Sequence, residues 1–196
     1  MKYLSILNNI LYGDRPEIEK HIEDWLEQYI IEPSESPCNS LIFLVPKKPE
    51  LQGNSMGTRL VTDLRRLNLK VIDQEFPIPT IQEILDQLQG CKYFSCLDLY
   101  SGFLQILLDP KDREKVAFST HLGHYQFKRL PFGLKSSPKF FMKILTNAVK
   151  GIPNLRCYID DLVIFTKDLA SHIKTFEKVM DALRKVGPNK KAFAHL

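Results

Sequence analysis

The chain has 196 residues, 44% of them hydrophobic and 26% charged, a composition that excludes collagen-like, coiled-coil and disordered proteins. Its formal net charge of +4 is compatible with a phosphate-bearing partner but does not require one. The four cysteines form no Cys-x-x-Cys pair and predict reduced thiols in an intracellular protein, and no apolar run is long enough to predict a membrane span.

The first half of the sequence predicts two helices and a hairpin. Apolar residues recur at helical spacing in the first helix, where Pro16 suits the first turn, and Gly90 closes the second helix. The predicted elements are, in chain order, a helix at 16–30, a turn-rich connector at 31–37, strands at 41–45 and 59–64 around a tip at 51–58, and a helix at 81–88.

The second half predicts short strands between two longer helices. The elements are a strand at 93–99, a helical or mixed segment at 101–108, strands at 115–119 and 125–130 around a turn at Gly123, a helix at 138–149, strands at 156–158 and 162–165, and a helix at 170–186. The hairpin signals favour an antiparallel α+β sheet over a doubly wound parallel one.

Two acidic features stand out against these apolar strands. Asp160 and Asp161 lie between two β-prone runs, so a tight hairpin is expected to hold both carboxylates at its tip. Asp98 lies near the end of another apolar strand. Carboxylates held this close repel each other unless a cation lies between them, and oxygen ligands on a rigid turn suit Mg²⁺. If the two features converge on one sheet, they can hold two metal ions.

Interpretations in which these acids have no catalytic or metal-binding role stay open at this point. An Asp-Asp pair is often a solvated surface turn, and an Asp on a strand is often satisfied by backbone donors. Taken singly, neither feature identifies an enzyme.

The order and spacing of several motifs add a resemblance to a known family. The chain resembles the reverse transcriptase of long-terminal-repeat retrotransposons, closest to the Ty3/gypsy group, from about Glu17 to about Gly187. The motifs that carry the resemblance are Ile30-Ile31-x-Pro33-Ser34-x-Ser36-Pro37, Asp63-Leu64-Arg65-Arg66-Leu67-Asn68, Phe94-Ser95-x-Leu97-Asp98-Leu99-x-Ser101-Gly102-Phe103-x-Gln105-Ile106, Pro131-Phe132-Gly133-Leu134 and Tyr158-Ile159-Asp160-Asp161.

The resemblance implies an α+β polymerase palm with an interleaved fingers subdomain. The expected boundaries are an N-terminal segment and fingers at 1–75, palm at 76–105, fingers at 106–135 and palm at 136–196. The implied reaction is RNA-directed DNA synthesis by two-metal catalysis, with two Mg²⁺ ions, or Mn²⁺ in their place.

The resemblance also assigns roles to individual residues. The catalytic triad falls on Asp98, Asp160 and Asp161, and the backbone carbonyl of Leu99 is expected to help hold a metal. Phe103 matches the aromatic that excludes a ribose 2′-hydroxyl, although plain core packing is an open alternative for it. The other implied positions are Arg59 with Lys47 or Lys48 at the triphosphate, Phe132 and Gly133 lining the nucleotide pocket, Gln105, Tyr158 and Ile159 at the primer and template, and Asp63 and Arg65 bracing the fingers.

The implied partners are an RNA or DNA template-primer, deoxynucleoside triphosphates and the remainder of a Pol polyprotein, with no membrane. The expected compartment is the cytoplasm, including a virus-like particle, or the nucleus. The family continues with a primer grip and a thumb, whereas this sequence stops at Leu196, so the expectation is a polymerase fragment without a thumb. The alternative function is a catalytically silent or domesticated remnant that binds nucleic acid or a protein partner.

Overall fold

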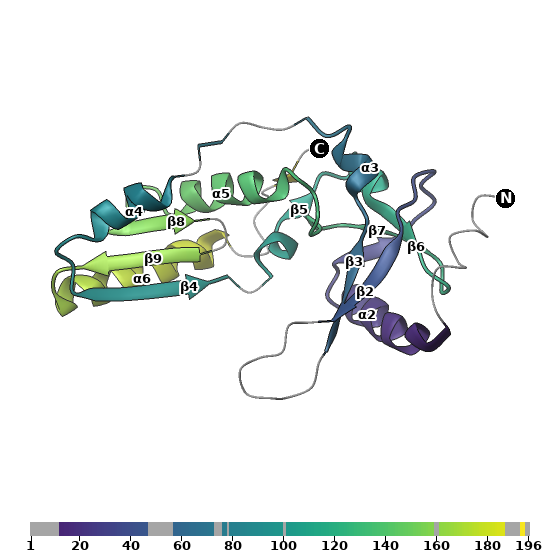
Figure 1. The fold of residues 1–196 in the computed structure, drawn as a ribbon, viewed down its shortest axis with the longest axis horizontal. Coiled ribbons are helices and arrows are strands. Elements are labelled where there is room, and N and C mark those ends of the chain that lie inside the picture. Colours follow the sequence, from purple (N-terminus) through teal and green to yellow (C-terminus); the bar gives the residue numbers. More distant parts are fainter. Residues whose placement is uncertain are drawn as a thin grey trace. The chain divides into compact units, whose positions relative to one another are not determined.

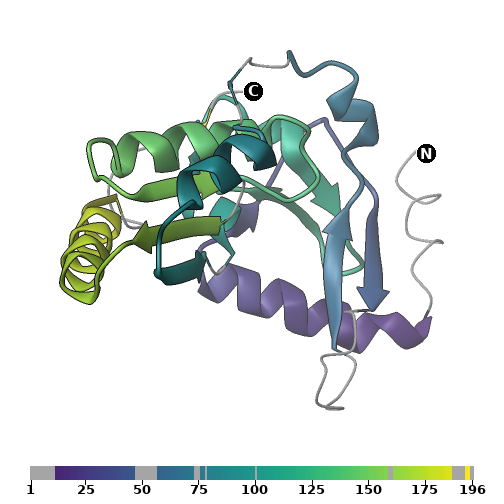
Figure 2. The same ribbon diagram turned by 60° about the vertical axis from the view of Figure 1, so that its left-hand side comes forward.

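The computed structural model describes residues 12–46, 57–72, 76–77, 79–99, 101–158, 161–186 and 193–194 (Figures 1 and 2). The chain divides into two compact units, each made from separate stretches of sequence. Unit 1 comprises Met1–Val71, Leu108–Lys135 and Ala194–Leu196, and unit 2 comprises Ile72–Leu107 and Ser136–Phe193. Each unit is described by itself below.

Unit 1 contains a helix, a three-stranded antiparallel sheet in the order β1-β7-β6, and the separate hairpin β2-β3. Its elements are η1 (Tyr12–Asp14), α2 (Arg15–Glu27), β1 (Ile31–Pro33), β2 (Ile42–Pro46), β3 (Thr58–Thr62), α3 (Arg65–Asn68), η3 (Arg113–Val116), β6 (Ala117–Ser119) and β7 (His124–Phe127).

The core of unit 1 forms where α2 packs on the three-stranded sheet. Ile18 and Ile22 are almost fully buried on one face of the helix. The Trp25 ring meets Phe118 of β6 edge-on at a centroid distance of 6.3 Å, and it lies 5.4 Å from the ring of Phe127 on β7. These large apolar side chains fix the helix against the sheet, since their burial is the main favourable contribution to folding.

Unit 2 contains a second three-stranded antiparallel sheet, in the order β4-β9-β8, with helices around it. Helix α5 contacts β8, and α6 contacts β9 and β4 (Figure 1). Its elements are α4 (Ile81–Leu88), β4 (Tyr93–Asp98), η2 (Gly102–Gln105), α5 (Ser137–Ala148), β8 (Leu155–Tyr158), β9 (Asp161–Thr166) and α6 (Leu169–Val186). The paired strands β5 (Leu107–Leu108) and β10 (Phe193–Ala194) each contain one residue of either unit.

The two faces of this second sheet differ. Side chains alternate between the faces of a strand, and one set, including Leu155, Leu162 and Ile164, is buried. The other set on β4, namely Phe94, Cys96 and Asp98, is exposed. The sheet therefore has a core face and a more open face. The open face carries Asp98, although Phe165 on the same face, opposite Phe94, is buried.

Several parts of the sequence fold differently from the prediction, among them the strands predicted at 59–64 and 125–130, which end at Thr62 and Phe127. The connector expected at residues 31–37 contains a strand, because Ile31–Pro33 form β1 and pair with β7. The strand expected at 115–119 begins only at Ala117, because Arg113–Val116 form a 3₁₀ turn. Pro33 is tolerated in β1 since that strand lies at the edge of its sheet.

Candidate active site

Two of the three predicted catalytic acids face each other in neighbouring strands. Asp98 is the last residue of β4 and Asp161 the first residue of β9, and their Cα atoms are direct partners in the antiparallel register. Directly opposed residues have Cβ atoms about 5 Å apart and project from the same face of the sheet. The expected convergence of the two acidic features is therefore observed for this pair. Asp160 and Ile159 lie outside the described residues.

The position of Asp161 differs in one respect from the prediction. The sequence placed both adjacent acids in the turn between the strands, whereas Asp161 is already paired in the sheet, with Tyr158 on one side and Asp98 on the other. The adjacent Leu162 and Ile164 are fully buried, so they fix the register of the strand that carries Asp161. The position of the Asp161 carboxylate is consequently fixed by core packing of β9 rather than by a turn.

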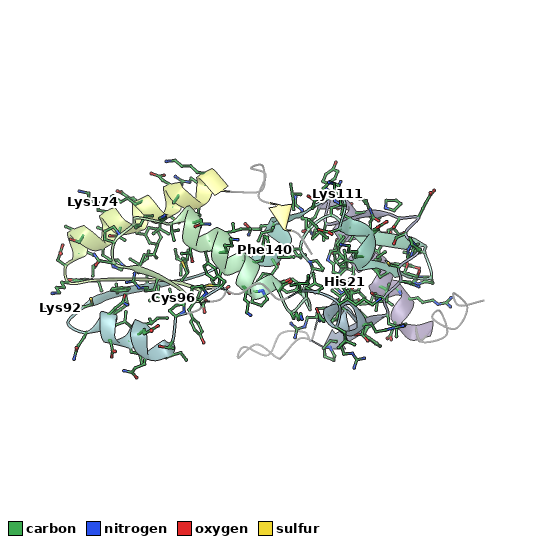
Figure 3. The ribbon with its side chains drawn as sticks, turned by 90° about the horizontal axis from the view of Figure 1, so that it is seen from above. His21, Lys92, Cys96, Lys111, Phe140 and Lys174 are labelled. Atoms are coloured by element: carbon green, nitrogen blue, oxygen red, sulfur yellow. The ribbon has the colours of Figure 1, made fainter. Side chains whose placement is uncertain are left out.

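Asp98 and Asp161 place two like charges side by side at one end of the open face, and Arg156 of β8 lies on the same face, opposite Val163. Like charges directly opposite each other destabilise a sheet pair. Cys96, labelled in Figure 3, lies two residues before Asp98 in β4, and its thiol pKa is raised, mainly by partial desolvation and then by the negative charges of Asp161 and Asp98. The charges of Asp161 and Asp98 thus make the electrostatic potential near this thiol negative, which would attract a cation.

The donor set fits a hard divalent cation. Two carboxylates offer the oxygen ligands that Mg²⁺ prefers, and Mg²⁺ usually takes only one or two protein carboxylates. The Leu99 carbonyl, predicted as a further ligand, accepts a hydrogen bond from the Gly102 N–H at 3.0 Å. A carbonyl oxygen has a second lone pair, so this bond leaves Leu99 able to bind a metal.

Phe103, the predicted sugar-sensing aromatic, is packed in unit 2. It lies in η2, is buried, and meets the Phe141 ring of α5 edge-on at a centroid distance of 5.4 Å. The core-packing interpretation is therefore observed, and contact with a nucleotide sugar stays a prediction. Gln105 is exposed and Tyr158 half-buried, and their contacts with primer or template stay predictions.

The predicted triphosphate and pocket residues that the structure describes belong to unit 1. Arg59 is exposed on β3, and Lys47 and Lys48 lie outside the described residues. Phe132 is half exposed, and Gly133 has a left-handed backbone with φ +91°. A Cβ atom at Gly133 would lie 3.6 Å from the Thr62 carbonyl oxygen, so the turn approaches the end of β3 closely.

Asn68 holds this turn in place, although its role is not predicted from the sequence. Its side-chain N–H donates to the Gly133 carbonyl at 2.8 Å, and its side-chain oxygen accepts from the Lys135 N–H at 2.9 Å. The single amide therefore ties α3 to both sides of Leu134, which is buried. No local pattern predicts this contact, because its partners lie more than sixty residues further along the chain.

Asp63 and Arg65, the predicted bracing residues, bind each other. The Asp63 carboxylate accepts from the Arg65 Nε at 2.9 Å, from its Nη2 at 2.7 Å and from its backbone N–H at 3.0 Å. The side-chain bonds from Arg65, followed by its backbone bond, lower the pKa of Asp63 to about 2.

This pairing predicts an acid-dependent stability. Unfolded Asp63 binds its proton near its ordinary pKa of 3.8, whereas folded Asp63 resists protonation until about 2. Its contribution is therefore complete above the unfolded pKa and is lost as the pH falls from about 4 to about 2. Urea unfolding at about pH 5 and about pH 2 should show a smaller loss for Asp63→Asn than for the wild type. Equal losses in the two proteins would contradict this account of the bond.

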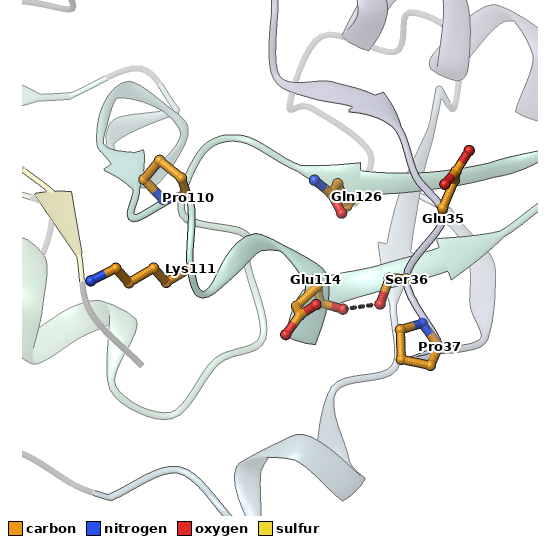
Figure 4. A pocket seen from close by; sticks show the side chains of 7 residues that line it. All are labelled: Glu35, Ser36, Pro37, Pro110, Lys111, Glu114 and Gln126. Carbon is orange, nitrogen blue, oxygen red and sulfur yellow. Dashed lines mark hydrogen bonds between the residues drawn. The ribbon is translucent and has the colours of Figure 1, made fainter.

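A separate hollow on unit 1 contains none of the predicted site residues (Figure 4). The Ser36 hydroxyl, on its wall, donates to the Glu114 carbonyl at 2.6 Å. The lining residues are Glu35, Ser36, Pro37, Pro110, Lys111, Glu114 and Gln126. In the part of the chain that the structure describes, no helix has both the length and the apolar character needed to cross a bilayer.

Comparison with known proteins gives a consistent result. Residues 45–191 match the family model described as "Reverse transcriptase (RNA-dependent DNA polymerase)". The chain is 40% identical over 169 residues to the "Retrovirus-related Pol polyprotein from transposon 297" of Drosophila melanogaster, covering 85% of this chain and 16% of that protein. It is 37% identical over 175 residues to the corresponding polyprotein of the gypsy transposon, covering 88% of this chain and 17% of that protein.

A solved structure agrees with these sequence relatives. The foamy viral protease-reverse transcriptase in complex with an RNA/DNA hybrid superposes with a TM-score of 0.80 at 29% identity, covering 91% of this chain and 23% of that one. The chain thus spans less than a quarter of these proteins. Because the family model matches most of the sequence and the α+β fold agrees with a solved member, this chain belongs to the reverse transcriptase family of retrotransposon Pol polyproteins.

Proposed function

We propose that this chain catalyses RNA-directed DNA synthesis as part of a retrotransposon Pol polyprotein. In the reaction, a primer 3′-hydroxyl attacks the α-phosphorus of a deoxynucleoside triphosphate, a new phosphodiester bond forms, and pyrophosphate leaves. The observation that carries the proposal is the direct opposition of Asp98 and Asp161 on the open face of the unit 2 sheet. Two directly opposed acids are unfavourable for the sheet alone, so a role in binding a cation accounts for the pair best.

The metal site is proposed to consist of Asp98, Asp160, Asp161 and the Leu99 carbonyl. Two bound Mg²⁺ ions, or Mn²⁺, would supply activation of the 3′-hydroxyl and stabilisation of the leaving pyrophosphate. The protein contributes the geometry. The strand register places Asp98 and Asp161 opposite each other, and the buried Leu162 next to Asp161 holds β9 in that register. Pre-set ligands of this kind reduce reorganisation during the reaction.

The remaining predicted residues are proposed to bind the nucleotide and the nucleic acid. Arg59, with Lys47 or Lys48, would bind the triphosphate, since a guanidinium fork matches phosphate geometry. The residues proposed for the other contacts are Phe103 at the sugar, Phe132 and Gly133 at the nucleotide pocket, and Gln105, Tyr158 and Ile159 at the primer and template.

The proposed substrates, subdomains and place of action follow from the relatives. Two solved structures of the foamy viral protease-reverse transcriptase are complexes with double-stranded DNA and with an RNA/DNA hybrid, and we propose the same nucleic acids as substrates here. Residues 1–75 and 106–135 are proposed as fingers, and residues 76–105 and 136–196 as palm. The proposed place of action is the cytoplasm, including a virus-like particle, or the nucleus.

Primer extension on an RNA template with Mg²⁺ tests the proposal directly. The wild type should extend the primer, Asp161→Asn should not, and Glu177→Gln, which changes an exposed acid on α6, should behave as the wild type. If the folded wild type does not extend the primer but binds the template-primer equally well with and without the Asp161 change, the polymerase proposal is wrong. That result would favour a silent nucleic-acid-binding remnant.

A further inference from the structure

The segment that carries Phe103 is packed against α5 without a gap. Gly102 is buried, and a Cβ atom built on it would lie 2.6 Å from the tip of the Phe141 ring. Real Cβ atoms essentially never approach another heavy atom this closely. The Phe141 ring therefore occupies the space in which a side chain at position 102 would lie.

The same ring also backs Phe103. The two rings meet edge-on at an interplanar angle of 82° and a centroid distance of 5.4 Å, which is a favourable aromatic geometry. Phe141 is itself buried and cannot swing into solvent without losing this packing. Phe103 is consequently packed against a ring on a different element, α5.

The backbone around Phe103 is fixed as well. Ser101 has a left-handed conformation with φ +48°, which is uncommon for a residue other than glycine. The Gly102 N–H donates to the Leu99 carbonyl at 3.0 Å, and the Ile106 N–H donates to the Phe103 carbonyl at 3.0 Å. With the backbone held at both ends of the turn, the Phe141 ring limits how far the Phe103 ring can move.

We propose that Phe141 is a specificity-determining positioning residue, which holds Phe103 in place so that deoxynucleotides are chosen over ribonucleotides. The inference rests on the proposed function. A ring excludes a 2′-hydroxyl only if it cannot retreat, because a single added hydroxyl is rejected by steric contact alone. Close-packed interiors transmit such constraints, so a shorter side chain at position 141 gives the Phe103 ring room to move.

The test compares incorporation of a deoxynucleotide and the matching ribonucleotide by primer extension. Phe141→Leu should lower the ratio of the two kcat/KM values about tenfold, out of an expected discrimination on the order of 10²-fold. Phe140→Leu is the matched control, since Phe140 is the adjacent, half-buried ring on the same helix (Figure 3) and should leave the ratio unchanged. A general loss of stability would lower both kcat/KM values together and leave their ratio intact.

A second variant provides a rescue. Gly102→Ala in the wild type forces the Phe141 ring away, whereas in Phe141→Leu the new methyl group enters the space that the ring has left. The double variant Gly102→Ala/Phe141→Leu should therefore recover discrimination relative to Phe141→Leu, a coupling that independent sites would not show. If Phe141→Leu does not fold, as judged by circular dichroism, Phe141→Met and the double variant carry the comparison.

The outcomes separate the two proposals. An active wild type whose ratio falls in Phe141→Leu and recovers in the double variant supports the inference. An active wild type whose ratio is the same in Phe141→Leu, or in Phe141→Met, overturns the inference and leaves the polymerase proposal standing. An inactive wild type overturns both.

Discussion

Asp98→Asn is expected to abolish primer extension and at the same time to make the metal-free protein more stable. The first effect follows from losing a ligand in the proposed metal site. Metal stabilisation of the reacting oxygens contributes several kcal/mol, which corresponds to a loss of about 10³-fold or more. The second effect follows from the register, since Asp98 lies directly opposite Asp161 and an amide removes that repulsion.

The gain in stability should be modest, because Asp98 is exposed and solvent screens the pair. Cross-strand charge pairs contribute about 0.2–1 kcal/mol, so a rise in Tm of about 1–3 °C is expected in EDTA. Mg²⁺ should stabilise the wild type and have little effect on the variant. Glu177→Gln serves as the control, with an unchanged Tm and an unchanged response to Mg²⁺. A variant that keeps its polymerase activity, or that melts earlier in EDTA, would show that the acid pair is not a metal site.

Asn68→Asp is expected to raise the KM for deoxynucleotides about tenfold at neutral pH while changing kcat much less. A carboxylate can still accept from the Lys135 N–H, but it cannot donate to the Gly133 carbonyl and instead repels it. Because the bond is exposed to solvent, its loss costs about 0.5–1.5 kcal/mol. Since Phe132 and Gly133 are the proposed pocket residues, the loss should appear chiefly in nucleotide binding.

Lowering the pH gives this prediction a specific signature. Once protonated, the carboxyl group that Asn68→Asp introduces would again offer one acceptor and one donor, so the KM of this variant should approach that of the wild type as the pH falls. Asn68→Ala loses both hydrogen bonds and should show no such recovery, so it is the matched control. If both variants respond to pH alike, Asn68 supports the fold in general rather than the nucleotide turn.

The extent to which the sequence predicts the fold depends on the distance over which contacts form. Helices α2, α4, α5 and α6 are local features with clear periodicity and end signals, and each lies within a residue or a few residues of its prediction. Strand β1 could not be predicted, because the segment 31–37 that begins with it is rich in turn-forming Pro and Ser. Its partner strand lies far ahead, and Glu32 is bonded to Gln126 at a separation of 94 residues.

The candidate site shows the same division. The acids were found because charged residues on apolar strands are chemically conspicuous, and the register then places Asp98 against Asp161. The supporting residues Asn68 and Phe141 have no comparable signal in the sequence. Asn68 forms two hydrogen bonds to a turn that is distant in sequence, and the Phe141 ring fills the space next to Gly102. Neither role can be predicted without the three-dimensional structure.

The division of each unit into separate stretches of sequence affects how the protein is made. When β1 leaves the ribosome, β7 has not yet been translated, and β4 likewise precedes both strands that complete its sheet. Neither sheet can form until much of the chain has been synthesised, so the backbone N–H and C=O groups of both early strands stay unpaired until then. Contacts of this range slow folding and expose nascent chains to aggregation. The yield of soluble protein should therefore depend on chaperones and translation rate more than on the stability of the finished fold.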